Sequence, residues 1–152
     1  MSDQQMINVT DSNVKPVNKV LYTANVHVSG GRDGLAQSND GRLDIKLTSP
    51  GSKGEGTNPE QLFAAGWSAC FIGALKHCAA AKGLTLPEDV AIDAQVDLAT
   101  GDDGFQLQAR LHVALPGFAE EDAVALAEAA HQTCPYSKAT RGNINVQINV
   151  AI

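Results

Sequence analysis

The chain has 152 residues and a mass of 15.9 kDa, the usual size of a single domain with one hydrophobic core. Residues of the set AVILMFWYC make up 43% and charged residues 18%, a composition that excludes disorder over most of the chain. The net charge of -6 and the pI of about 5.0 provide no positive field for polyanions. We therefore expect neither nucleic acid nor a membrane as a partner.

The N-terminal residues 1–16 are polar and show no sustained hydrophobic period. This predicts a flexible tail before a single domain over residues 17–152. The tail lacks the basic-then-apolar order of a signal peptide, and the longest near-apolar stretch, residues 62–81, is interrupted by Ser68, Lys76 and His77. We therefore expect a cytoplasmic protein.

Hydrophobic periodicity divides the rest of the chain into elements, because a period of two marks strands and a spacing of three to four marks helices. The predicted elements are strands over 20–28, 35–38 and 43–47, a helix over 59–82, a hairpin with strands over 91–99 and 105–115, a helix over 119–134 that Pro135 ends, and a last strand over 144–152. Hairpins predominate in this order, which favours an α+β domain in which antiparallel sheets enclose one central helix.

The helix over 59–82 begins with a capping signal, since Asn58 precedes Pro59 and Gln61 follows three residues later. Gly83 stops it. Its apolar and small residues extend all the way round, so the helix needs burial on every side. The same helix of a second chain is the simplest cover for the remaining surface, which predicts an obligate homodimer.

Three cysteines are too few, and of the wrong parity, for a secreted disulfide framework. Cys70 lies in the predicted buried helix, where a cysteine is ordinarily inert. If the helix breaks near Gly66, however, Cys70 falls in the first turn of a new segment, whose dipole would lower its pKa. Cys134, at a helix C-terminus, suits a resolving partner as well as a packed core residue. We interpret Cys78 as core filler.

A reactive thiolate needs a fixed cation nearby. Arg32 is framed by glycines, which could aim its guanidinium at a site, although an exposed loop arginine is equally ordinary. In the functional interpretation Glu60 pairs with Arg32 bidentately and holds it. Ten residues of straight helix separate Glu60 from Cys70 by roughly 15 Å. The helix therefore bends near Gly66, or the two residues that meet belong to different chains.

Three segments together resemble the organic hydroperoxide resistance proteins of the Ohr/OsmC family: KVLYTANVHVSGGRDG (19–34), GTNPEQLFAAGWSACFIGAL (56–75) and CPYSKATRGNINV (134–146). The first and third look more like the Ohr branch than the OsmC branch. Trp67 stands where the family pattern leads us to expect a tyrosine, and the loop over 49–57 is short.

The resemblance implies an OsmC-like fold, an intertwined homodimer and a thiol-dependent peroxidase that acts on organic and lipid hydroperoxides. It implies that Cys70 is the peroxidatic cysteine and Cys134 the resolving one. Arg32 would hold the thiolate, with Glu60 as its salt-bridge partner. The implied reductant is dihydrolipoamide or a lipoylated protein, and no bound cofactor or metal is implied. Leu62, Phe63, Trp67 and Phe105 are candidates for an apolar substrate channel, although core packing is the more ordinary role for each.

Two other functions compete with the peroxidase. A metal site could draw on Cys70, His77, Cys78, His131 and Cys134, but the sequence has neither CxxC nor HExxH. A non-catalytic protein that binds hydrophobic ligands between its subunits would need no reactive thiol. The relative reactivity of Cys70 and Cys78 would distinguish that protein from the peroxidase.

Overall fold

The structure is a computed structural model that describes residues 5–9 and 14–152. Its elements in chain order are β1 (Val26–Ser29), a 3-10 turn η1 (Gly31–Asp33), β2 (Leu35–Ser38), β3 (Asp44–Lys46), α1 (Pro59–Ala81), β4 (Ala91–Gly101), β5 (Gly104–Ala114), α2 (Glu120–Thr133), α3 (Pro135–Thr140) and β6 (Asn145–Ala151). The predicted α+β class is confirmed.

Within the described residues, the strands form two three-stranded sheets, ordered β1-β2-β3 and β4-β5-β6. The first sheet and the β4–β5 hairpin are antiparallel, as expected. The pairing of β5 with β6 is parallel, from Gln108 opposite Asn145 to Ala114 opposite Ala151, so the prediction of purely antiparallel sheets is wrong at this pair. The reason is the connection: α2 and α3 carry the chain back along the sheet before β6 begins.

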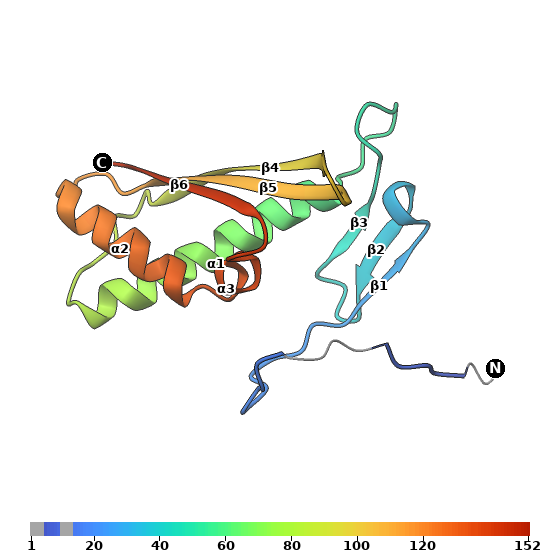
Figure 1. Ribbon diagram of the computed structural model, residues 1–152, viewed down its shortest axis with the longest axis horizontal. Coiled ribbons are helices and arrows are strands. Elements are labelled where there is room, and N and C mark those ends of the chain that lie inside the picture. Colours follow the sequence, from blue (N-terminus) through green and yellow to red (C-terminus); the bar gives the residue numbers. More distant parts are fainter. Residues whose placement is uncertain (1–4, 10–13) are drawn as a thin grey trace.

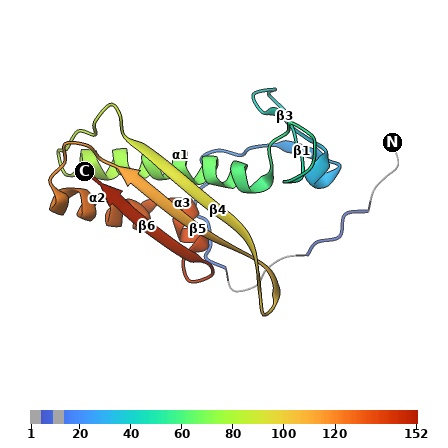
Figure 2. The same ribbon diagram turned by 90° about the horizontal axis from the view of Figure 1, so that it is seen from above.

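The β4-β5-β6 sheet forms one layer, and α1, α2 and α3 lie together on one side of it (Figures 1 and 2). Alternate residues of β5 point into the core between the layers, where Leu111 and Val113 are fully buried. They meet the fully buried Trp67, Phe71 and Leu75 of α1. The β1-β2-β3 sheet lies apart from this body, beyond the N-terminal end of α1 (Figures 1 and 2).

Helix α1 begins and ends close to the predicted residues. The Asn58 side chain accepts a hydrogen bond of 2.9 Å from the Gln61 N–H, and Gly83 follows the helix with a φ of 69°. By length and composition α1 could cross a membrane, but here it packs against β4 and α2. Its apolar face is therefore used inside the domain.

A single chain does not cover this helix on every side, as the expected need for a second chain implies. The residues that share one side of α1, Gln61, Ala65, Ala69 and Gly73, are exposed. They are spaced four apart, which aligns them in one row along the helix. The sheet and α2 pack against other faces of the helix. This row is therefore one part of α1 that the chain leaves uncovered, in addition to exposed residues near its C-terminal end.

Two other boundaries differ from the prediction. Residues 20–25 continue the alternating pattern but form no strand, because no strand within residues 5–9 and 14–152 pairs with them; Val20, Leu21 and Tyr22 are exposed. Pro135 not only follows α2 but also begins the short helix α3, where proline at the first position costs no hydrogen bond. Of the predicted tail, residues 1–4 and 10–13 lie outside the described residues, while 5–9 and 14–16 are exposed without helix or strand.

Candidate active site

Two cysteines that are 64 residues apart in sequence lie side by side. Cys70 comes from the middle of α1, and Cys134 lies at the junction between α2 and α3. Their sulfur atoms are 3.4 Å apart, and both thiols are free. A disulfide bond is about 2.05 Å long, so a movement of roughly 1.4 Å would join them. Cys134 is fully buried and Cys70 is partly exposed, so Cys70 is the thiol that a substrate can reach.

The surroundings of Cys70 within one chain disfavour its thiolate. Burial raises the pKa of Cys70, and the Cys134 thiol raises it further, while a hydrogen bond from the Tyr136 backbone N–H lowers it; the net shift is upward. The helix has no break near Gly66, which was one of the two arrangements left open, because α1 runs uninterrupted from Pro59 to Ala81 and places Cys70 in a helix interior. The expected help from a helix N-terminus is therefore missing.

Gly66 lies where α3 meets α1. A Cβ atom on Gly66 would lie 3.4 Å from the Tyr136 hydroxyl oxygen, which is van der Waals contact. The Tyr136 ring therefore packs over Gly66, and it also meets Phe63 edge to face at a centroid distance of 6.2 Å. Gly66 is thus part of the contact between α1 and α3.

Helix α3 also makes a polar contact with α1. The Trp67 indole Nε1–H donates to the Ser137 hydroxyl at 3.2 Å, and both residues are fully buried. The sequence reasoning missed Tyr136 and Ser137, although they lie in the segment that carried the family resemblance; their proximity to Cys134 was the available signal. Among the channel candidates, Phe63 and Trp67 lie near the cysteines, whereas Phe105 is 82% exposed just after the β4–β5 turn.

Arg32 and Glu60 form a second pair. Both terminal guanidinium nitrogens donate to the carboxylate, at 2.8 and 2.6 Å, which is the bidentate geometry expected in the functional interpretation. The hydrogen bond from Arg32 lowers the pKa of Glu60, and the same bond raises the pKa of Arg32. The pair is therefore ionised across the physiological pH range.

The loop that carries Arg32 is held at both ends. Gly30 and Gly31 have φ values of 72° and 60°, which other residues rarely adopt. At Gly34 a Cβ atom would lie 1.7 Å from the Ser29 carbonyl oxygen. The Asp33 carboxylate also accepts hydrogen bonds from the Ser49 N–H and hydroxyl at 3.0 and 2.9 Å. Gly30, Gly31 and Gly34, the glycine frame of this loop, thus help to fix the Arg32 guanidinium beside the first turn of α1.

The two pairs do not meet within one chain. Glu60 and Cys70 are ten residues apart on an uninterrupted helix, which corresponds to about 15 Å along its axis. The groups that shift the pKa of Cys70 are its own burial, Cys134 and the Tyr136 amide, and Arg32 is not among them. The sequence left two arrangements open: a helix bend near Gly66, or a site built from two chains. The continuous helix excludes the bend.

The other candidate groups lie elsewhere. Cys78 packs in the core, with its sulfur 3.5 Å from the Thr133 hydroxyl. Across residues 5–9 and 14–152, no group of three or more His, Cys, Asp and Glu side chains is placed to hold a metal ion.

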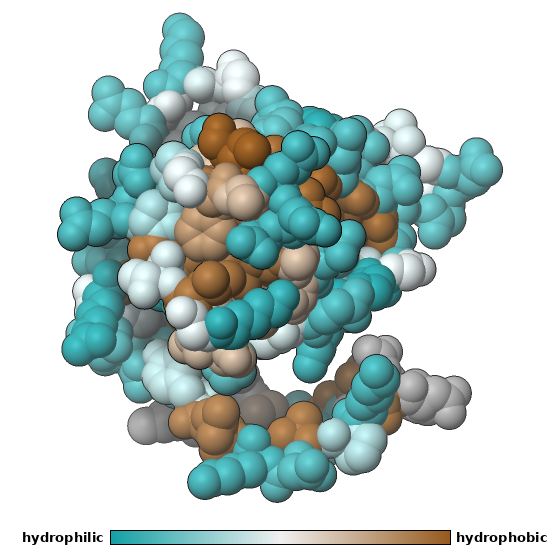
Figure 3. Space-filling view, turned by 90° about the vertical axis from the view of Figure 1, so that its left-hand side faces the viewer, coloured by the Kyte–Doolittle hydropathy of each residue, from teal (hydrophilic) through white to brown (hydrophobic). Residues whose placement is uncertain are grey.

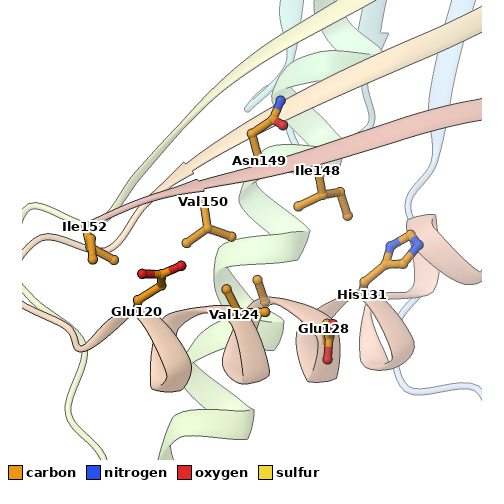
Figure 4. A pocket seen from close by; sticks show the side chains of 9 residues that line it. Glu120, Val124, Glu128, His131, Ile148, Asn149, Val150 and Ile152 are labelled. Atoms are coloured by element: carbon orange, nitrogen blue, oxygen red, sulfur yellow. The ribbon is translucent and has the colours of Figure 1, made fainter.

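A groove of about 560 Å³ lies between α2 and β6 (Figure 4). Val124, Ile148, Val150 and Ile152 supply its apolar part, and apolar atoms are visible on the end of the molecule that faces the viewer in Figure 3. None of its lining residues is a cysteine, so this groove is distinct from the thiol pair.

Mild oxidation of the purified protein is expected to join Cys70 to Cys134 within one chain and to leave Cys78 as a thiol. The reason is distance: the first two sulfurs are 3.4 Å apart, whereas Cys78 lies about 12 Å along the helix from Cys70. Peptide mapping by mass spectrometry under non-reducing conditions measures the pairing. Cys78→Ala should form the same disulfide. A disulfide that contains Cys78, or one between chains, would contradict the geometry.

Comparison with known proteins identifies the family of this chain. Residues 51–149 match the family model described as OsmC-like protein. The chain is 50% identical over 137 residues to an organic hydroperoxide resistance protein of Xanthomonas axonopodis pv. citri, covering 88% of this chain and 96% of that one. It is 46% identical over 135 residues to the organic hydroperoxide resistance protein OhrB of Bacillus subtilis, covering 86% and 98%.

Among solved structures, an organic hydroperoxide resistance protein from Legionella pneumophila superposes with a TM-score of 0.82 at 43% identity, covering 88% of this chain and 100% of that one. The resemblance that the three sequence segments carried is confirmed. This chain belongs to the OsmC-like protein family, among relatives named organic hydroperoxide resistance proteins.

Proposed function

We propose that this protein is a thiol-dependent peroxidase that reduces organic hydroperoxides to alcohols. The observation that carries the proposal is the pair of free thiols 3.4 Å apart, with the partly exposed member at Cys70. The names of the relatives support the substrate class, since they are organic hydroperoxide resistance proteins at up to 50% identity. The metal-site alternative has no comparable support.

The reaction has two thiol steps. The Cys70 thiolate attacks the distal oxygen of the hydroperoxide, the O–O bond breaks, and the alkoxide takes a proton to become the alcohol while Cys70 becomes a sulfenic acid. The Cys134 thiol then attacks the Cys70 sulfur, and the hydroxyl group leaves with the thiol proton as water. The resulting disulfide is reduced by a dithiol, which becomes a disulfide itself.

The first step requires a cation, because burial works against the thiolate within one chain. Arg32 is held in place by Glu60 but lies about three helical turns from Cys70 of the same chain. We therefore place the Arg32–Glu60 pair of one chain beside Cys70 of a second copy. The pair would then stabilise the thiolate and the departing alkoxide.

Features of the single chain support a homodimer with this arrangement. The exposed row on α1 includes Ala65, Ala69 and Gly73. No atom of the described residues lies within 4 Å of a Cβ built on Gly73. In a two-fold contact, residue i of one chain meets residue j of the other and the reverse. Ala65 lies midway between Glu60 and Cys70, so antiparallel α1 helices that cross near Ala65 would bring those two residues level.

The reductant follows from access to the disulfide. Cys134 is fully buried, so a reducing thiol has to approach from the Cys70 side. A slender dithiol such as dihydrolipoamide, free or on a lipoylated protein, fits this approach better than the broad surface of a thioredoxin. The proposal includes the cytoplasmic location expected from the sequence and requires no bound cofactor.

Cys70→Ser is expected to abolish the consumption of organic hydroperoxide, because a serine hydroxyl is not an effective nucleophile toward peroxide at neutral pH. Cumene hydroperoxide loss, measured with dihydrolipoamide present, tests this. Cys78→Ala is the matched control in the same helix and should keep nearly the full rate. Retained consumption by Cys70→Ser would overturn the peroxidase assignment.

Dihydrolipoamide is expected to sustain many turnovers, whereas thioredoxin with its reductase and NADPH should support little beyond the first. The physical reason is the burial of Cys134 behind Cys70. Peroxide consumed per protein in the two systems, at equal concentrations of reducing dithiol, gives the comparison. Equal or faster cycling with thioredoxin would remove the lipoyl-type dithiol from the proposal.

A chain carrying Arg32→Ala and a chain carrying Cys70→Ser should complement each other when they are co-expressed. In a site built across two chains, each mixed dimer has one complete site, so random pairing restores about a quarter of the wild-type activity. In a site built within one chain, every site stays incomplete and mixing restores nothing. The two variants expressed separately are the controls, and the absence of complementation despite mixed dimers would exclude the shared site.

A further inference from the structure

The junction between α1 and α3 contains two contacts of matching spacing. Cys70 meets Cys134, and one turn away Trp67 meets Ser137. On α1 the two contacting residues are three apart, and on the α2–α3 segment they are also three apart. The hydrogen bond between Trp67 and Ser137 therefore lies next to the thiol pair, one helical turn along both segments.

This hydrogen bond is unusual for its burial. Among the side-chain to side-chain hydrogen bonds of the described residues, only the one between Trp67 and Ser137 is completely buried. A buried indole N–H or hydroxyl without a partner costs free energy, so each group requires the other. Two apolar side chains would fill the same space without that requirement, but they would not fix the position of α3 so closely.

The hydrogen bond between Trp67 and Ser137 holds the helix that directly follows Cys134. Cys134 is the last residue before α3, and Ser137 lies in the buried face of that helix. Helix α3 has only six residues, which is too short to keep its place without tertiary contacts. Its contacts with α1 include the Tyr136 ring, which lies over Gly66 and meets Phe63, and the Tyr136 amide at Cys70. They also include the hydrogen bond that Trp67 donates to Ser137.

We infer that Trp67 and Ser137 are a positioning pair that holds α3 against α1, so that Cys134 stays within reach of Cys70 when the disulfide forms. The inference rests on the proposed function for its biological meaning. The step that it serves is the second one: the Cys134 thiol attacks the sulfenic acid of Cys70, the S–O bond breaks, and water leaves. The attack of Cys70 on the hydroperoxide does not need Cys134 and is independent of the pair.

During turnover, the sulfenic acid of Cys70 has two possible fates: a disulfide with Cys134 or further oxidation. A sulfenic acid that waits for its partner can react with a second hydroperoxide to give sulfinic acid, which is not reversed in the cycle. Close placement of Cys134 shortens that wait, since a positioned group behaves as if it were present at very high concentration. The pair therefore protects Cys70 from overoxidation without touching the substrate.

The test measures the Cys70–Cys134 disulfide directly. The reduced proteins are equilibrated with mixtures of oxidised and reduced dithiothreitol, and the disulfide fraction is read by alkylation and mass spectrometry. Trp67→Phe and Ser137→Ala should each lower the equilibrium constant for the disulfide by about tenfold, because Cys134 loses its fixed position. Thr140→Ala is the matched control, since the Thr140 hydroxyl is also buried in α3 but bonds only to carbonyls of Tyr136 and Ser137. It should keep the wild-type value.

The double variant Trp67→Phe/Ser137→Ala separates positioning from simple destabilisation. It leaves no buried polar group unpaired, and it remains available if Ser137→Ala alone fails to fold. Positioning predicts the same equilibrium constant as in Trp67→Phe alone. A wild-type equilibrium constant in Trp67→Phe or in the double variant would overturn the inference, even if the free energy of unfolding fell.

A second readout follows single additions of cumene hydroperoxide without a reductant. Ser137→Ala should form the sulfenic acid at the wild-type rate but convert more of it to sulfinic acid as the peroxide concentration rises. An unchanged ratio of disulfide to sulfinic acid would count against the pair. The dithiothreitol equilibrium needs no peroxide, so it tests the positioning pair even if Cys70→Ser shows that the protein is not a peroxidase.

Discussion

The packing of the short helix α3 on the middle of α1 is the contact on which the thiol chemistry depends. It places two sulfurs from distant parts of the sequence 3.4 Å apart. The Tyr136 ring packs over Gly66 at this junction. The buried hydrogen bond between Trp67 and Ser137 fixes the same junction one turn away. A helix of six residues thus obtains from its neighbour the order that it lacks by itself.

The burial that positions the thiols also opposes the ionisation of Cys70. Removing Cys70 from water raises its pKa, and the nearby Cys134 thiol acts in the same direction. A single hydrogen bond from the Tyr136 amide is too little to reverse this. Meanwhile the chain holds a well-ordered guanidinium at Arg32, fixed by Glu60 and by the glycine frame of its loop, where its own Cys70 cannot use it. A shared site reconciles these facts, because it gives the thiolate a cation without exposing it to bulk water.

Local signals in the sequence predicted most of the elements. The capping residue Asn58, the alternation over 91–114 and the acids at the start of α2 each act within a few residues, and the structure follows them closely. The non-local features were harder. The sequence shows a glycine at position 66 but not that Tyr136 packs over it, so a helix break there stayed open as one of two arrangements. The direction of β6 depends on the path of α2 and α3 over the sheet, which no pattern within β6 records.

Two apolar surfaces remain uncovered in the single chain. The alternating residues 20–25 predict a strand but form none, and the apolar circumference of α1, which predicts burial with the help of a second chain, is left partly exposed. Hydrophobic patterns record what a residue touches in the functional assembly and do not distinguish contacts within a chain from contacts between chains. The uncovered segment precedes the strand that leads to Arg32, and the uncovered row on α1 lies between Glu60 and Cys70. The surfaces that lack a partner therefore flank the two halves of the site, which is where a second copy would have to bind to complete it.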